Sequence, residues 1–304
     1  MEKVKSKNGK LLIKLVAILF AFSALSASAK TPYEFSVYGG GGYSFYSCRV
    51  SNQTVLIPHS DVYHSAVNGV SSSGSSGDLG VGFTGFIAPQ VGLHVGLGFG
   101  LYNTNIKVDS LTFVTKDLYD ELNENRPYDL YTKLSEYSEK HQTFCFSIPF
   151  MFQFQTMQSG SSWRRSTSDI GFYAKAGLKL NILLSNTYET KVSTAYKAAH
   201  YTDLDNWAET QAFVGLGPSK IKGGKGNFGY VQTLFALEAG AKMHIGDNRF
   251  FYVGAYFDYG LNDPSKNNRE LINESSLEGS LPLLEFSNRI NLMTIGLKLR
   301  LAFQ

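Results

Sequence analysis

Few residues in this 304-residue chain are arranged for catalysis or metal binding. The sequence contains no HExxH, GxSxG or Walker A motif, and the GGKG segment at 223–226 lacks the spacing of a phosphate-binding loop. His59, Asp61 and His64 could gather a metal ion, because imidazoles and carboxylates are suitable ligands. Two histidines and one acid in a polar segment are more often solvated. We therefore predict no metal site there.

Two further groups could carry a ligand or a reaction. Asp203 and Asp205 lie near Trp207, which would suit calcium or a sugar, although a polar loop with a packed tryptophan is the simpler interpretation. A lipid-modifying enzyme would need a serine, a histidine and an acid together. His141, His200 and several serines are available, but no spacing brings them together. We predict no catalytic residue, no cofactor and a non-enzymatic protein.

A third group consists of charged residues that alternate with apolar ones. If the apolar rows face lipid, the charged rows meet in a confined interior, where an unpaired charge is costly. We therefore predict a network of ion pairs that fills the interior. A conducting pore is the alternative. The predicted network comprises Glu34, Asp78, Asp169, Lys175, Lys179, Glu238, Lys242, Asp258, Lys298 and Arg300.

The segments that would position these charges are long and alternate with a period of two. Residues 289–304 place an apolar row from Met293 to Phe303 opposite a row that contains Lys298 and Arg300. Ordinary strands run about 5–6 residues, whereas a tilted transmembrane strand needs about 9–11. This stretch is therefore predicted to cross a membrane as a strand.

Seven other segments repeat this pattern, and Pro149 predicts a local irregularity in one of them. The connections alternate long and short along the chain. Within the second long connection, residues 111–138 have helix-like spacing. The predicted strands are 33–46, 77–88, 91–102, 143–155, 169–183, 231–245, 249–261 and 289–304. The predicted long outer loops are 47–76, 103–141, 184–230 and 262–288.

These segments predict an all-β fold, an eight-stranded antiparallel up-and-down transmembrane β-barrel with long outer loops. A soluble sandwich or lipocalin-like barrel would also alternate. Its interior would be apolar and its outside wet, however, which does not fit the charged rows.

The N-terminal residues 1–29 have the layout of a cleaved signal peptide, with a basic start, an apolar run and Ala27-Ser28-Ala29. Without them the chain has 23 basic and 24 acidic residues, so its charge gives no support for nucleic-acid binding. No later apolar run is long enough for a membrane helix. Cys48 and Cys145 could form a disulfide in an exported protein or remain free thiols.

On these features the chain resembles outer-membrane β-barrel proteins of the OmpA-type eight-stranded superfamily, as found in Bacteroidetes-like bacteria. The resemblance rests on the signal peptide, the alternating strands and the segments 251–263 and 294–303. The sequence departs from the pattern in lacking a peptidoglycan-binding domain after the last strand. Phe303 is followed by Gln304, which shifts by one position the terminal aromatic residue that such barrels use in assembly.

The resemblance implies an integral protein in the outer membrane of a Gram-negative bacterium, with residues 30–304 as the barrel. Its partners would be outer-membrane lipid, the barrel-assembly machinery and an extracellular ligand or host surface. Three functions remain open. The first is a structural or adhesive role through the outer loops, the second a narrow channel for small solutes, and the third a membrane-embedded lipid-modifying enzyme.

Overall fold

The computed structural model describes residues 32–50, 54–56, 63–65, 67–68, 70–120, 125–156, 170–191, 194–208, 217–219, 225–227, 231–246, 248–262 and 287–304. These residues are almost entirely β-structure. The strands are β1 (Tyr33–Val50), β2 (Thr54–Leu56), β3 (Tyr63–Ser65), β4 (Val67–Asn68), β5 (Ser71–Ala88), β6 (Val91–Asp120), β7 (Arg126–Gln155), β8 (Ile170–Lys191), β9 (Thr194–Tyr201), β10 (Asn206–Ala208), β11 (Gly217–Ser219), β12 (Lys225–Asn227), β13 (Val231–Gly246), β14 (Arg249–Gly260) and β15 (Ser287–Phe303).

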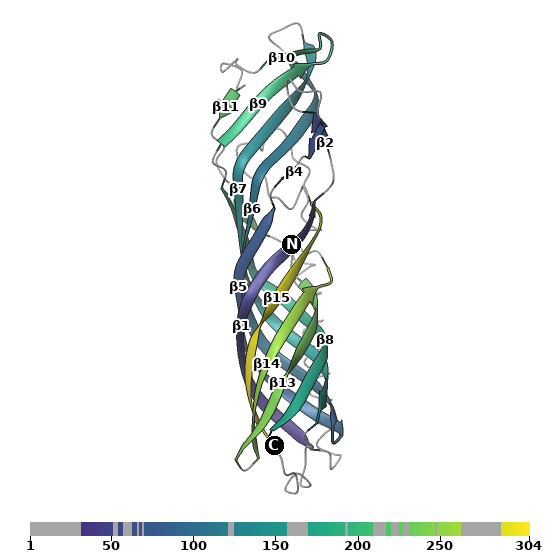
Figure 1. Ribbon diagram of the computed structural model, residues 1–304, viewed down its shortest axis with the longest axis vertical. Helices are drawn as coiled ribbons and strands as arrows, with labels where there is room; N and C mark the ends of the chain where they lie inside the picture. The colour runs from purple at the N-terminus through teal and green to yellow at the C-terminus, as the bar shows by residue number, and fades with distance from the viewer. Residues whose placement is uncertain are drawn as a thin grey trace, which may run out of the picture.

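Eight of these strands close into a ring in the order β1, β5, β6, β7, β8, β13, β14, β15, and every neighbouring pair is antiparallel. The ring forms the lower half of the molecule in Figure 1. The short turns and the C-terminus lie together at its lower end, which we call the inner end. The predicted fold class is confirmed.

The register of the ring is staggered. A path that starts at Arg249 and crosses to each partner residue in turn returns to β14 at Tyr259, ten residues further on. The intermediate partners are Phe303, Phe35, Phe83, Val95, Phe150, Leu178 and Phe235. In a closed barrel this stagger fixes a strand tilt of roughly 35–45°. A row of cross-strand partners that is followed from β14 to β15 and on around the ring therefore moves steadily away from the inner end.

The alternation along each strand separates an apolar outside from a polar inside. On β15 the outward Leu297 is 65% exposed, while the inward Arg300 is 2% exposed. Phe150, Phe152 and Phe154 of β7 are likewise exposed, because a period of two places all three on one face. Among the described residues, no helix is long and apolar enough to cross a membrane.

Pro149 produces the expected irregularity. Strand β7 remains paired with β8 at Pro149 and Lys179, whereas its ladder with β6 is interrupted between the pairs Val95–Phe150 and Gly98–Ser147. Proline has no backbone N–H to donate, which explains the gap. Gly96 gives the ring of Pro149 room, since a Cβ there would lie 3.0 Å from the proline Cγ.

The prediction of a long loop at 103–141 with helical spacing at 111–138 is wrong. Strands β6 and β7 are each 30 residues long and stay paired up to Asp120 and Arg126. The alternation changes phase at Glu136, whose φ is 52°. Burial then moves from Thr132 and Leu134 to Tyr137 and Glu139. This change of phase makes a strand resemble a helix in sequence.

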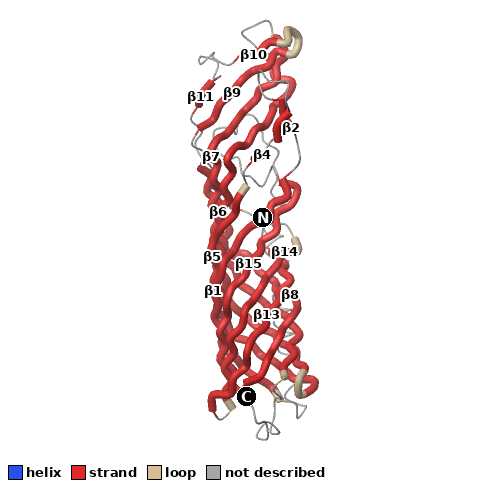
Figure 2. The backbone as a smooth tube through the Cα atoms, in the orientation of Figure 1, coloured by secondary structure: helices blue, strands red, loops and turns tan. Residues whose placement is uncertain are grey.

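The other two described connections are also partly strand. The Ser/Gly-rich segment 70–77 lies largely in β5, and the segment 184–230 continues β8 as far as Lys191. Strand β9 then pairs with β7, and β10 and β11 pair with β9. Together these strands form the outer sheet, defined as β6 and β7 beyond the ring with β9, β10 and β11. It occupies the upper half of the molecule (Figure 2).

Candidate functional site

The interior of the ring near the inner end is occupied by a buried ion pair. Lys242 of β13 donates to Glu34 Oε1 of β1 at 2.6 Å and to Gln155 Oε1 of β7 at 3.1 Å. Tyr252 of β14 donates its hydroxyl to Glu34 Oε2 at 2.5 Å. The Lys242 Nζ also lies 4.0 Å from the ring centre of Phe250. Four strands therefore meet at one buried pair of opposite charges.

A second group of ion pairs lies further along the interior. Lys179 Nζ is 3.0 Å from Asp258 and 3.6 Å from Asp78, and Lys298 Nζ is 2.8 Å from Asp78. Lys298 also approaches Glu238 at 4.0 Å. Asp78, Lys179 and Lys298 each contact two groups of opposite charge, and these groups come from different strands. Such compensation is what buried charges require.

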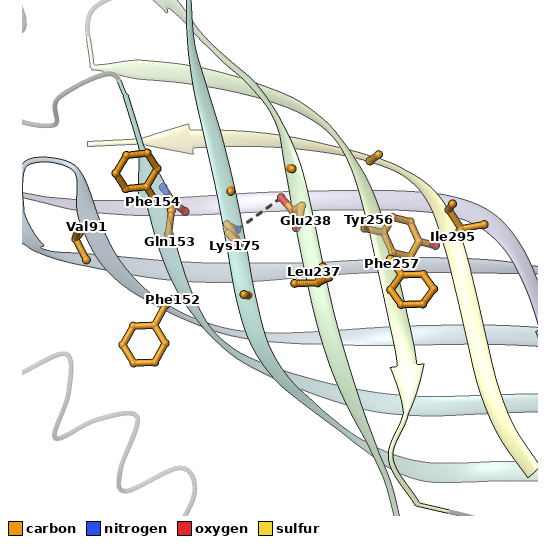
Figure 3. Close-up of a pocket in the computed structure, with 14 residues that line it drawn as sticks. Val91, Phe152, Gln153, Phe154, Lys175, Leu237, Glu238, Tyr256, Phe257 and Ile295 are labelled. Carbon is orange, nitrogen blue, oxygen red and sulfur yellow. Dashed lines mark ion pairs between the residues drawn. The ribbon is translucent and has the colours of Figure 1, made fainter. Parts of the chain in front are cut away.

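Lys175 and Glu238 form the third pair, at 3.7 Å between Nζ and Oε1, as Figure 3 shows. Tyr173 donates its hydroxyl to the same Glu238 oxygen at 2.9 Å. Tyrosines pack the space between these pairs. A Cβ added at Gly80 or Gly98 would lie within 2.8 Å of the Tyr38 hydroxyl. The interior is thus filled by side chains that pair with one another.

Arg300 is predicted to join the network of ion pairs, but its closest contacts are with an amide and an aromatic ring. Its Nη1 donates to Gln153 Oε1 at 3.1 Å, and its guanidinium lies 3.7 Å from the ring centre of Tyr252. Its Nε and Nη2 have no hydrogen-bond partner among the described residues. The positive charge is therefore held by an aromatic face and an amide, within the field of the nearby Glu34.

The structure brings together nine of the ten residues of the predicted network in one interior, and Asp169 lies outside the described residues. Sequence reasoning did not include Gln153, Gln155, Tyr173 and Tyr252 in this network. All four lie on the predicted inward rows. Position alone does not show which uncharged groups complete the hydrogen bonds of a charge. That depends on the register between strands.

A separate polar cluster lies in the β6–β7 extension. Glu139 is fully buried and accepts hydrogen bonds from the Tyr137 hydroxyl and from His141 Nε2, the latter at 2.5 Å. The ring of Tyr46 meets the ring of His141 edge to face at 5.1 Å. The sequence does not predict this cluster, because Glu139 and His141 lie in the predicted loop at 103–141. Residues of a loop are not expected to share one face, whereas residues two apart on a strand do.

The far end of the outer sheet carries an aromatic cluster. The ring of Trp207 lies 4.5 Å from that of His200 and 4.7 Å from that of Tyr131. His200 Nε2 lies 3.0 Å from an oxygen of the exposed Asp205. The tryptophan is therefore packed. No group of three histidine, cysteine or acidic residues suited to a metal occurs in the described part, which leaves out His59 and Asp61.

Tyr201 ties this end of the sheet together. Its hydroxyl donates to Asp120 Oδ2 at 2.7 Å, and its ring packs on that of Tyr128. Burial, then the hydrogen bond to Asp120, raise the pKa of Tyr201 to about 12. The link joins β9 to the tip of β6.

Cys145 is a free, buried thiol, so the disulfide considered for it is not formed. Its Sγ lies 3.6 Å from the Ser147 hydroxyl and from the backbone oxygen of Gly100. The side chain of Cys48 lies outside the described residues.

A closed antiparallel ring with an apolar outside and a charged inside has the architecture of a transmembrane β-barrel. No protein-family model and no curated protein matches the sequence. Solved structures are similar at low TM-score. The outer membrane protein OprG from Pseudomonas aeruginosa is 13% identical, with a TM-score of 0.31 over 90% of this chain and 97% of that chain.

Two further solved structures are similar. Ail of Yersinia pestis, in complex with the heparin analogue sucrose octasulfate, is 9% identical, with a TM-score of 0.27 over 90% of this chain and 99% of that chain. Neisserial surface protein A is 10% identical, with a TM-score of 0.26 over 88% and 95%. At these values the similarities carry no argument about function. The class of this chain rests on its own strands.

Proposed function

We propose that the chain is an integral protein of a Gram-negative outer membrane that acts without catalysis, by binding a partner at the cell surface through its outer sheet. The extension of β6 and β7 beyond the ring carries this proposal. A transmembrane barrel needs only about 9–11 residues per strand, whereas these two strands have 30 each. The additional length supports a sheet that faces away from the inner end (Figure 1). Placement within the OmpA-type superfamily remains a prediction.

The interior supports binding over transport. Lys242 and Glu34 are almost fully buried, and the pairs around Asp78 link three strands. An eight-stranded barrel has an interior just wide enough for side chains. A path for solutes would require these ion pairs to separate, and each separated charge would then have to be hydrated. A narrow channel is therefore the second candidate.

The outer sheet has nearly balanced charge. The described residues within 104–141, 194–208 and 217–219 include six Lys and Arg and eight Asp and Glu. A polyanion would be recognised by a clustered basic surface. Aromatic and hydrogen-bonding groups such as Tyr131, Trp207 and Asp205 favour a partner of low net charge, for example a neutral glycan or a protein surface.

A shortened hairpin tests the proposal. Leu111 and Leu134 are cross-strand partners, so residues 112–133 can be replaced by a two-residue turn. The full chain and the shortened chain would be refolded in detergent, checked for heat-modifiable mobility, and applied to arrays of neutral glycans and extracellular proteins. We expect a bound array member that the shortened, folded barrel no longer binds.

Recordings in planar bilayers complete the test. We expect no stepwise conductance from either barrel, because the interior pairs are the same in both. Binding that is unchanged by the shortened hairpin would contradict the proposal, and stable single-channel conductance of the full chain would support the channel instead.

A further inference from the structure

The outside wall of the barrel carries a hollow that none of the functions above uses. It has a volume of about 550 Å³, and its lining combines outward apolar side chains of six neighbouring ring strands with the buried, inward Gln153, Lys175, Glu238 and Tyr256. Ligand pockets in proteins measure roughly 300–1,000 Å³. The wall around it consists mainly of phenylalanine and leucine, so a depression of this size is a local feature.

Small side chains in the same register produce the hollow. Ala174 of β8, Ala239 of β13 and Ala255 of β14 are successive cross-strand partners and form its floor. Larger side chains, Phe152, Phe154 and Phe257, stand at its borders (Figure 3). Lys175 and Glu238 are paired on the inner side of the same wall. The floor is thus one alanine layer thick between the hollow and the charged interior.

The hollow runs diagonally across the strands from the inner end. Its floor continues a row of cross-strand partners that starts at Val91, the first residue after the β5–β6 turn, passes the bordering Phe154 and reaches the three alanines. Four inter-strand steps of about 4.8 Å give a length of roughly 19 Å. At a strand tilt of about 40° the row climbs about 12 Å. One leaflet of the hydrocarbon core is about 15 Å thick.

We propose that this hollow binds one acyl chain of an inner-leaflet phospholipid. The hollow is apolar, lies in the lipid-facing wall, and begins where headgroups lie. Its length and climb match a chain that enters from the interface and ends near the bilayer centre. A chain lying along the alanine floor has Phe152, Leu237 and Phe257 along one side, so it contacts protein on two sides. It therefore gains more dispersion contacts than a chain on a flat wall.

A second copy of the barrel fits the hollow less well. In a two-fold dimer the same face of each subunit forms the contact. The alanine floors would then face each other across a gap, since the bordering phenylalanines would meet first. A flexible chain fills the space without such a constraint.

Filling the hollow tests the inference. Ala239→Phe places a ring on the floor, and Val81→Phe adds the same ring to an exposed lipid-facing position on β5, away from the hollow. Each folded barrel would be mixed with phosphatidylethanolamine at low ratio in mild detergent, and the phospholipids retained would be counted by native mass spectrometry. Heat-modifiable mobility confirms that each variant is folded.

We expect the wild-type and Val81→Phe barrels to retain one phospholipid. Its occupancy should be about tenfold lower in Ala239→Phe, as expected for losing the contacts of about two methylene groups. Phosphatidylglycerol should behave like phosphatidylethanolamine, because the chain is what binds. Equal retention by Ala239→Phe and wild type, equal loss in Val81→Phe, or retention that depends on the headgroup would overturn the inference. It rests on the membrane placement alone and would stand if the outer sheet bound nothing.

Discussion

At the scale of single residues, the interior depends on charges that are compensated in pairs. Lys242 and Glu34 are 208 residues apart in sequence, and Lys242 Nζ lies 2.6 Å from Glu34 Oε1. Removing one partner of a buried pair leaves a charge without compensation, which costs more than removing both. The pair therefore stabilises the closed ring, and it gives a direct test of the interior.

Lys242→Met should destabilise the folded barrel by about 3–5 kcal/mol, because Glu34 then stays buried without its cation. Urea unfolding in lipid vesicles, followed by tryptophan fluorescence, measures the change. The double variant Lys242→Met with Glu34→Gln should recover most of the loss. If the single and double variants were equally unstable, the pair would have no role in the ring.

Gly82 is a second position where a single atom matters. A Cβ there would lie 2.4 Å from the Cε1 of His94, whose Nδ1 is hydrogen-bonded to Thr84 at 2.9 Å. Gly82→Ala should therefore cost roughly 1–3 kcal/mol through overpacking. Adding His94→Ala should remove much of that cost, and a double-mutant cycle of unfolding free energies measures the coupling. Additive effects would show that the two residues do not touch.

Much of this interior could be predicted from alternation alone. Lys298 and Arg300 lie on the inward row that their spacing indicates, since a period of two fixes the face of each residue. The partners could not be predicted. Lys298 meets Asp78 and Arg300 meets Gln153, because the stagger of ten residues around the ring decides which inward residues share a level.

At the scale of elements, β6 and β7 join two structural parts, the ring and the outer sheet, in one hairpin. Their inner halves are two staves of the ring, and their outer halves hold β9 and the aromatic cluster. The outer halves could not be predicted as strands, because the alternation changes phase at Glu136 and the backbone is left-handed at Asp117. The strands 231–245 and 249–261 carry no such change, and their predicted bounds agree closely with β13 and β14.

The hydrogen bond between Tyr201 and Asp120 tests the position of β9 against the tip of β6. The folded pKa of Tyr201, about 12, lies above the ordinary value of 10. The neutral phenol therefore contributes its full stability below pH 10 and loses it as the pH rises through 12. Asp120→Asn should lower the Tyr201 pKa towards 10, as followed by NMR of barrels labelled at the tyrosine Cζ. An unchanged pKa would mean that Asp120 does not contact this phenol.

At the scale of the whole molecule, one ring serves three environments. Its outside is apolar, its paired charges fill the interior, and its longest hairpin continues beyond the ring as a sheet (Figure 1). The ring holds the base of the outer sheet, and the proposed binding surface would benefit from such a fixed position. The proposed function requires one direction across the membrane, with the short turns inside and the outer sheet outside.

Labelling of intact cells tests that direction. In a chain with Cys48 and Cys145 replaced by alanine, single cysteines would be placed at the exposed Lys133 of the outer sheet and the exposed Gln90 of the β5–β6 turn. A membrane-impermeant maleimide should label Lys133→Cys on intact cells. It should label Gln90→Cys only after the outer membrane is disrupted. Labelling of Gln90→Cys but not Lys133→Cys on intact cells, or of neither after disruption, would show that the barrel does not have this direction in the membrane.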